Sequence, residues 1–171
     1  MNKKSRKVAI LDRDGVLNEN RGYVGHLDKF KWIKGAKSAI KFLKKENFYV
    51  AVITNQSGIA RNYFKVKDVK NLHNFMQNDL KKINTKIDVF YFSPYHIDGV
   101  IQRYKKKSSC RKPGIGMFKK LQEKIAINKK KSFMIGDKKT DMIFAKKCGV
   151  KGFFFRKGNL FNFVKKNIIN D

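Results

Sequence analysis

The sequence predicts an α/β fold: a doubly wound, Rossmann-like parallel sheet with helices on both faces. Two observations predict it. Short apolar runs, each long enough for one buried strand, alternate along the chain with stretches whose apolar residues recur at helical spacing. Several of these runs also end directly in polar residues, as strands do at the ligand-binding edge of an open parallel sheet. The 171 residues suffice for one core, so we expect a single domain over 1–171.

The first element is a strand over residues 8–11, followed at once by Asp12-Arg13-Asp14-Gly15. Two carboxylates so close together repel each other unless a cation or a proton shares the site. Asp and Gly are also ordinary turn residues, so this stretch alone would fit a plain strand-to-turn transition. Its significance depends on what ends the later strands.

The later elements alternate in the same way. Helical spacing marks residues 35–46, 69–83, 117–125, the stretch ending at Gly149, and 160–168, and apolar runs mark strands at 48–53, 87–92, 132–135 and 150–155. In the second helix His73 lies off the apolar face, so we expect it to be exposed. Residues 93–111 have no period and are expected to form a loop insertion. No stretch has room for a separate cap domain.

Four motifs stand in order at predicted strand ends or just before a helix. They are Asp12-Arg13-Asp14-Gly15-Val16-Leu17-Asn18, Thr54-Asn55-Gln56-Ser57-Gly58-Ile59-Ala60-Arg61, Cys110-Arg111-Lys112-Pro113 and Gly136-Asp137-Lys138. This order resembles the haloacid dehalogenase (HAD) superfamily of phosphohydrolases. Together with Gly22-Tyr23-Val24, the motifs are most similar to the D-glycero-D-manno-heptose 1,7-bisphosphate 7-phosphatases. Histidinol-phosphate phosphatases share much of the pattern.

The resemblance implies a phosphatase that works through an aspartyl-phosphate. Asp12 would be the nucleophile, and Asp14 would protonate the leaving alkoxide and then deprotonate the hydrolytic water. Lys112 would neutralise the phosphoryl oxygens, and the Thr54 hydroxyl would help to hold the transferring group.

The resemblance also implies Mg²⁺, which prefers oxygen ligands. Asp12, the backbone carbonyl of Asp14 and Asp137 would bind it, and Asp141 would hold a metal-bound water. Substrate recognition would fall on Asn20, Arg21, Gly22, Tyr23, Thr54, Asn55, Gln56, Ser57, Arg111, Lys112 and Lys138. A phosphorylated sugar of heptose metabolism, as used for lipopolysaccharide, is the expected substrate, with histidinol phosphate as the alternative.

Many relatives bind a structural zinc through Cys-x-His and Cys-x-Cys in the insertion. The matching positions here are Ser93, Tyr95, Ser108 and Cys110. A closed structural zinc site needs four good ligands, and serine and tyrosine are poor ones. We therefore predict that this chain binds no zinc.

The net charge of +28 is unusual, and 34 of the 41 basic residues are lysines. Such charge suits a nucleic-acid-binding protein or a phosphatase of nucleic-acid ends. The lysines are scattered, however, so we expect solvated charge and no nucleic acid as the main partner. Two cysteines and no apolar run of membrane length lead us to expect a cytoplasmic protein that does not bind membranes. We also expect a monomer.

Overall fold

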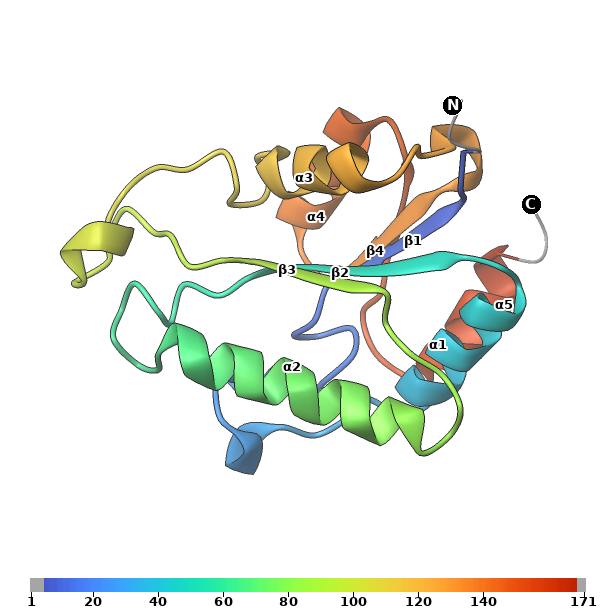
Figure 1. The fold of residues 1–171 in the computed structure, drawn as a ribbon, viewed down its shortest axis with the longest axis horizontal. Helices are drawn as coiled ribbons and strands as arrows, with labels where there is room; N and C mark the ends of the chain where they lie inside the picture. The colour runs from blue at the N-terminus through green and yellow to red at the C-terminus, as the bar shows by residue number, and fades with distance from the viewer. Residues whose placement is uncertain (1–4, 169–171) are drawn as a thin grey trace.

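The computed structural model describes residues 5–168 and contains a five-stranded parallel sheet in the order β3-β2-β1-β4-β5 (Figure 1). The strands are β1 (Val8–Leu11), β2 (Tyr49–Asn55), β3 (Val89–Ser93), β4 (Phe133–Gly136) and β5 (Lys151–Phe154). The helices are α1 (Ala36–Lys45), α2 (Val66–Lys81), α3 (Gly116–Lys124), α4 (Lys139–Cys148) and α5 (Leu160–Ile168). Single 3₁₀ turns lie at Leu27–Lys29, Gln102–Tyr104 and Lys129–Lys131. The predicted doubly wound fold is confirmed.

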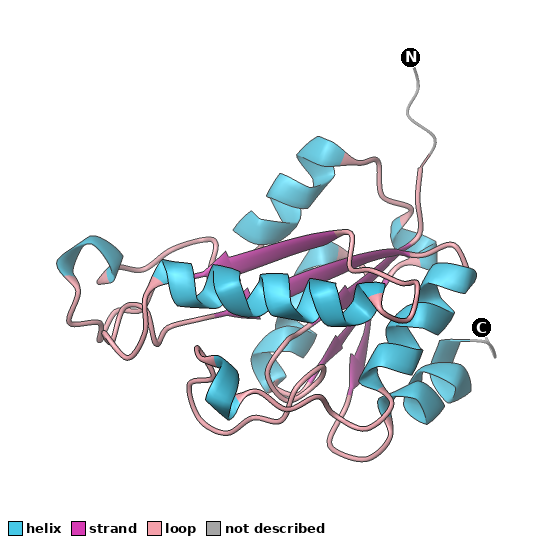
Figure 2. Ribbon diagram, turned by 60° about the horizontal axis from the view of Figure 1, so that its bottom comes forward, coloured by secondary structure: helices cyan, strands magenta, loops and turns pink. Residues whose placement is uncertain are grey.

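Helices cover both faces of the sheet because alternate strand residues point to opposite sides. Ala9 and Leu11 of β1 belong to the core that includes α1, α2 and α5, whereas Val8 and Ile10 belong to the core that includes α3 and α4. Figures 1 and 2 show these two helical layers on either side of the strands. Both faces of the central strands are therefore apolar, as is typical of parallel sheets.

The chain reverses its direction of winding between β1 and β4, which are neighbours in the sheet. The β1–β4 ladder runs on past the strands, since the backbone N–H of Asp12 donates to the carbonyl of Ile135 at 3.0 Å. Ligands of open α/β sheets bind at such a switch point, beyond the carboxyl ends of the strands. Asp12 and Asp137 both emerge there.

The expectation that His73 is exposed was wrong. His73 is only 6% exposed and lies on the inner side of α2, together with Val69, Leu72 and Met76. These four positions follow the i, i+3, i+4, i+7 spacing of one helix face.

The insertion at 93–111 projects from the end of β3, at the left of Figure 1. It is joined to the loop after β2, because the backbone N–H groups of Val100 and Ile101 both donate to the carbonyl of Ala60, at 2.7 and 3.0 Å. The rings of Tyr95 and Tyr104 pack 6.1 Å apart within it. Among residues 5–168, no helix is both long and apolar enough to cross a membrane.

Candidate active site

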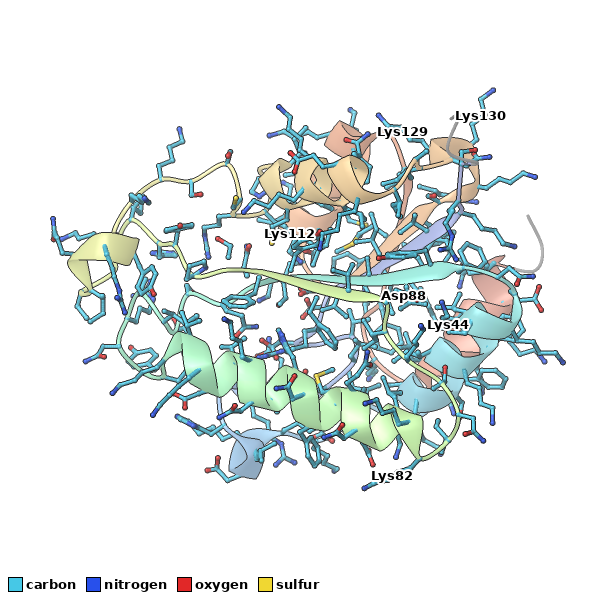
Figure 3. The ribbon with its side chains drawn as sticks, in the orientation of Figure 1. Lys44, Lys82, Asp88, Lys112, Lys129 and Lys130 are labelled. Carbon is cyan, nitrogen blue, oxygen red and sulfur yellow. The ribbon has the colours of Figure 1, made fainter. Side chains whose placement is uncertain are left out.

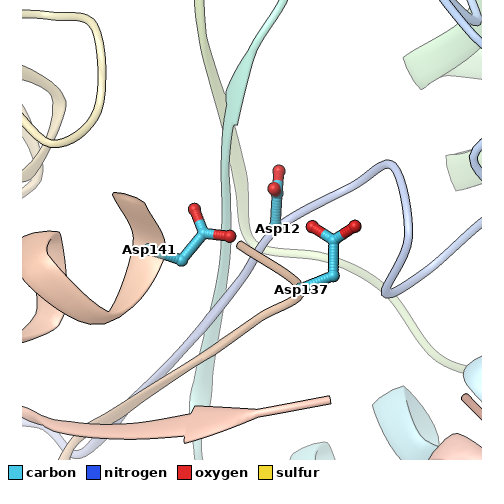
Figure 4. A group of neighbouring side chains, drawn as sticks. All are labelled: Asp12, Asp137 and Asp141. Carbon is cyan, nitrogen blue, oxygen red and sulfur yellow. The ribbon is translucent and has the colours of Figure 1, made fainter. Parts of the chain in front are cut away.

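Three carboxylates converge at the carboxyl edge of the sheet (Figure 4). Asp12 follows β1, Asp137 follows β4, and Asp141 lies in the first turn of α4. One carboxylate oxygen from each of the three lies within 4.8 Å of the other two. Asp141 is anchored because its carboxylate accepts the backbone N–H of Lys138 at the start of the helix. The fold thus concentrates negative charge at one point.

Lys112 is the cation of this cluster (labelled in Figure 3). Its Nζ lies 3.1 Å from Oδ1 of Asp12 and 2.7 Å from Oδ1 of Asp141. Burial by itself would lower the pKa of Lys112, but the two carboxylates raise it above its ordinary value, so the side chain stays charged. Asn55 fixes its backbone: the Asn55 side chain accepts the Lys112 N–H at 2.9 Å and donates to its carbonyl at 3.1 Å.

Asp137 is a partly buried carboxylate whose charge Lys138 and Lys112 offset only in part. Burial and the nearby Asp12 carboxylate raise its pKa from 3.8 to about 6. Its Oδ1 is buried without a hydrogen-bond partner. Within the group of Asp12, Asp137, Asp141 and Lys112, three negative charges face one positive charge. A divalent cation fits this imbalance and this all-oxygen donor set, which is the type that Mg²⁺ prefers.

Two glycines permit the close approach of the segments that carry the acidic residues. A Cβ on Gly15 would lie 2.1 Å from Oδ2 of Asp137, and Gly15 also has a φ of +87°, which side chains rarely tolerate. A Cβ on Gly136 would lie 2.2 Å from Cβ of Asp141. Gly15, directly after Asp14, and Gly136, directly before Asp137, are therefore needed for the geometry of the cluster.

The pKa of Asp137 predicts how magnesium affinity depends on pH. Below about pH 6 the metal-free carboxyl holds a proton that a cation must displace. One unit lower, at pH 5, about a tenth of the carboxyl is ionised, so the apparent Kd for Mg²⁺ should be about tenfold higher than at pH 7. Because the pKa is raised in the folded state, the metal-free protein should also lose stability as pH rises through 6. Calorimetric titration with Mg²⁺ from pH 5 to 7 tests the predicted change in affinity, and a Kd that does not depend on pH would contradict it.

Asp14 does not join the carboxylate cluster. Its side chain turns toward three donors. Arg13 contacts both oxygens at 3.0 and 3.1 Å, the Asn18 amide donates to Oδ1 at 2.9 Å, and the Gln56 amide donates to Oδ2 at 2.9 Å. The Gln56 amide also donates to the buried Thr54 hydroxyl at 3.1 Å. Asp14 is the predicted acid–base group and Thr54 the predicted holder of the phosphoryl group. The Gln56 amide thus connects the two.

A cavity of about 280 Å³ lies beside this network. It brings together most of the substrate-binding positions expected from the sequence. Its lining consists of Asp14, Asn20, Gly22, Tyr23, Asn55, Gln56, Ser57, Gly58, Arg61, His96, Arg111 and Lys138. Arg21 does not line it, and instead forms a surface ion pair with Glu19 at 2.8 Å. Thr54 is absent from the lining because it is 1% exposed.

Arg61 and His96 are cavity residues that the sequence did not identify as such. Nη2 of Arg61 lies 3.3 Å from Nδ1 of His96 and 3.8 Å from the Asp98 carboxylate. Burial lowers the pKa of Arg111, and the Arg61 charge lowers it further. Burial, Arg111 and Arg61 likewise lower the pKa of His96, which favours the neutral ring. Arg61 closes the Thr54–Arg61 motif, and that position was the available signal.

Comparisons with known proteins agree with this geometry. Residues 7–155 match the family model described as "Polynucleotide kinase 3 phosphatase". The chain is 40% identical over 164 residues to a D-glycero-beta-D-manno-heptose-1,7-bisphosphate 7-phosphatase of Rhodopseudomonas palustris, covering 96% of this chain and 91% of the relative. It is 33% identical to a D-glycero-alpha-D-manno-heptose-1,7-bisphosphate 7-phosphatase of Photorhabdus laumondii, covering 88% and 82%.

The chain belongs to the HAD phosphatase superfamily, on its heptose-bisphosphatase branch. A solved structure supports the same placement. The D,D-heptose 1.7-bisphosphate phosphatase of B. bronchiseptica, complexed with magnesium and phosphate, superposes with a TM-score of 0.80 at 26% identity, covering 94% of this chain and 87% of that one. The family resemblance expected from the motifs is therefore confirmed. The roles of the individual residues remain predictions.

Proposed function

We propose that this HAD phosphatase removes the 7-phosphate of D-glycero-D-manno-heptose 1,7-bisphosphate, with Mg²⁺ bound by Asp12, Asp137 and the backbone carbonyl of Asp14. The observation that carries the proposal is the combination of the Asp12–Lys112 pair with a cavity that holds two further guanidinium groups, Arg61 and Arg111. One phosphate would meet the nucleophile and the second would meet the arginines. Bound Mg²⁺ would supply positive charge to the transferring phosphoryl oxygens.

The residues divide the hydrolysis into two steps. In the first, an oxygen of Asp12 bonds to phosphorus, the phosphorus–oxygen bond to the sugar breaks, and Asp14 gives its proton to the departing sugar oxygen. In the second, Asp14 takes a proton from water as that water attacks phosphorus, which releases phosphate and regenerates Asp12. Lys112 holds Asp12 in place and balances charge in both steps.

Charge favours a sugar bisphosphate over histidinol phosphate, the nearest alternative. Histidinol phosphate carries an ammonium group, and Arg61, Arg111 and Lys138 in the cavity wall would repel it. A second phosphate would instead be attracted, because arginine can bind it with two hydrogen bonds. The names of the relatives include both heptose anomers, so both belong in any test.

We also propose that the insertion is held without zinc. Nδ1 of His96 is occupied by Arg61 and by the backbone N–H of Asp98 at 3.1 Å. Lys106 lies over the Tyr95 ring, 4.9 Å from its centre, and Nη1 of Arg111 donates to the Tyr95 carbonyl at 3.3 Å. Tyrosine at a position where relatives have a zinc-binding histidine thus takes part in packing that holds the loop.

Nucleic acid is not proposed as the main partner. Figure 3 labels Lys82 on one side of the molecule and Lys129 and Lys130 on the opposite side, so the positive charge is spread over the surface. The free thiols of Cys110 and Cys148 suit a reducing compartment, and we propose a cytoplasmic monomer.

A substrate panel tests the proposed function. Phosphate release is measured with Mg²⁺ for both heptose bisphosphate anomers, histidinol phosphate and a 3′-phosphorylated oligonucleotide. We expect one of the heptose bisphosphates to give the highest kcat/KM, and removal of its 1-phosphate from the substrate to raise KM. A higher kcat/KM for histidinol phosphate or for the oligonucleotide would overturn the substrate assignment.

A further inference from the structure

Arg13, between the two site aspartates, is the starting point. It has no exposed surface, so its charge must be balanced inside the protein. Nε and Nη2 both donate to Oδ1 of Asp14, at 3.1 and 3.0 Å, and Nη2 also contacts the Gln56 side chain at 3.0 Å and the carbonyl of Val24. The guanidinium therefore orients the Asp14 carboxylate from behind, while the Asp14 side chain still lines the substrate cavity.

The remaining contact of the guanidinium is with His73. Nη1 of Arg13 lies 3.3 Å from Nε2 of His73, which comes from the middle of α2. Since a guanidinium can only donate, Nε2 must be the acceptor and the ring must be neutral. Burial, and then the Arg13 charge, lower the pKa of His73 to about 3, in agreement with a neutral ring.

Two aromatic rings of β3 fix the orientation of His73. Its ring stacks on Phe90 with centres 4.4 Å apart and an angle of 18° between the planes, and Phe92 meets it edge-on at 5.9 Å. A continuous series of contacts thus joins the interface of α2 and β3 to His73, then to Arg13, then to Asp14.

We infer that His73 is a positioning residue for proton transfer by Asp14, acting through the Arg13 guanidinium. The inference rests on the proposed phosphatase function, in which Asp14 gives its proton to the departing oxygen while the phosphoryl group moves to Asp12. Without an acceptor at His73, Nη1 of Arg13 would be buried and unpaired, so the guanidinium would shift and take the carboxylate with it. A small displacement of an acid–base group costs one to two orders of magnitude in rate.

The test compares two leaving groups. A sugar oxygen must be protonated as it leaves, whereas the phenolate released from p-nitrophenyl phosphate needs no proton. The value of kcat/KM depends only on the steps up to and including phosphoryl transfer to Asp12. It therefore reports this transfer and not the later attack of water. The experiment uses full-length protein with Mg²⁺ and whichever alkyl phosphate the unaltered enzyme hydrolyses best.

His73→Met keeps the volume and removes the acceptor, and His73→Gln keeps an acceptor oxygen within reach of Arg13. We expect His73→Met to lower kcat/KM for the alkyl phosphate about 10- to 100-fold. Its kcat/KM for p-nitrophenyl phosphate should stay within about twofold of the value for the unaltered enzyme. His73→Gln should recover most of the lost activity. Met76→Ala, on the same buried face of α2, is the matched control. It should change kcat/KM for the alkyl phosphate and for p-nitrophenyl phosphate by the same factor.

A proportional loss with both substrates in His73→Met would assign His73 a purely structural role and overturn the inference. So would an unchanged alkyl activity, or a His73→Gln variant as impaired as His73→Met. If His73→Met does not fold, His73→Leu provides the same comparison. Failure of the proposed function would be seen separately, as an unaltered enzyme that does not hydrolyse any alkyl phosphate.

Discussion

Replacing Asp12 with asparagine is expected to abolish phosphate release while the protein remains folded. An amide is not a nucleophile toward phosphorus and is a weaker metal ligand than a carboxylate, so the loss should be at least about 10⁴-fold. The fold should survive because the asparagine oxygen can still accept the Arg13 backbone N–H, which now donates to Asp12 Oδ1 at 2.7 Å. Removing one of three crowded negative charges also relieves repulsion on Asp137.

The measurement combines phosphate release with thermal unfolding. Asp28→Asn, which alters an exposed acid far along the chain from Asp12, is the matched control and should retain full activity. Incubation of the unaltered enzyme with ³²P-labelled substrate followed by acid quench should trap label on the protein, and the Asp12→Asn variant should trap none. Turnover by a clean Asp12→Asn preparation at a few per cent of the normal rate would contradict the aspartyl-phosphate mechanism.

The carboxylate cluster was predictable because it depends on strand ends. Asp12 and Asp137 each follow an apolar run, and parallel strands bring their carboxyl ends to one edge whatever their separation along the chain. Lys112 is different, because it follows no strand. Its position depends on the insertion and on the Asn55 side chain, and only the family resemblance indicated its role.

The buried support of the site was not predictable in the same way. Arg13 lies between two aspartates just after a strand, where a charged side chain is ordinarily expected to face solvent. The sequence-based interpretation placed His73 off the apolar face of α2, but 73 has the spacing of the buried positions Val69, Leu72 and Met76. The burial of His73 is compensated by the Arg13 guanidinium, which itself is also held by Asp14, Gln56 and the Val24 carbonyl. The contact between Arg13 and His73 joins positions 60 residues apart, and periodicity within one helix does not reveal it.

Metal removal is the second large effect that we expect. With Mg²⁺ withdrawn by a chelator, Asp12, Asp137 and Asp141 face Lys112 with two negative charges in excess, and an anionic substrate would add to the repulsion. Turnover should therefore stop, and Mg²⁺ alone should restore it fully. Mg²⁺ should also raise the Tm, because it binds the folded state.

Zinc should have neither effect on this chain. The insertion is joined to Ala60 by two backbone hydrogen bonds and contains the Tyr95–Tyr104 and Tyr95–Lys106 contacts, so hydrogen exchange within 93–111 should be the same before and after chelation. The triple variant Ser93→Cys, Tyr95→His, Ser108→Cys supplies, with Cys110, the four ligands that relatives use, and it serves as the positive control for elemental analysis. We expect no zinc because hydroxyl side chains at three of the four positions leave too few ligands to close a structural site. Stoichiometric zinc in the unaltered protein would contradict this expectation, and so would activity that returns only with zinc.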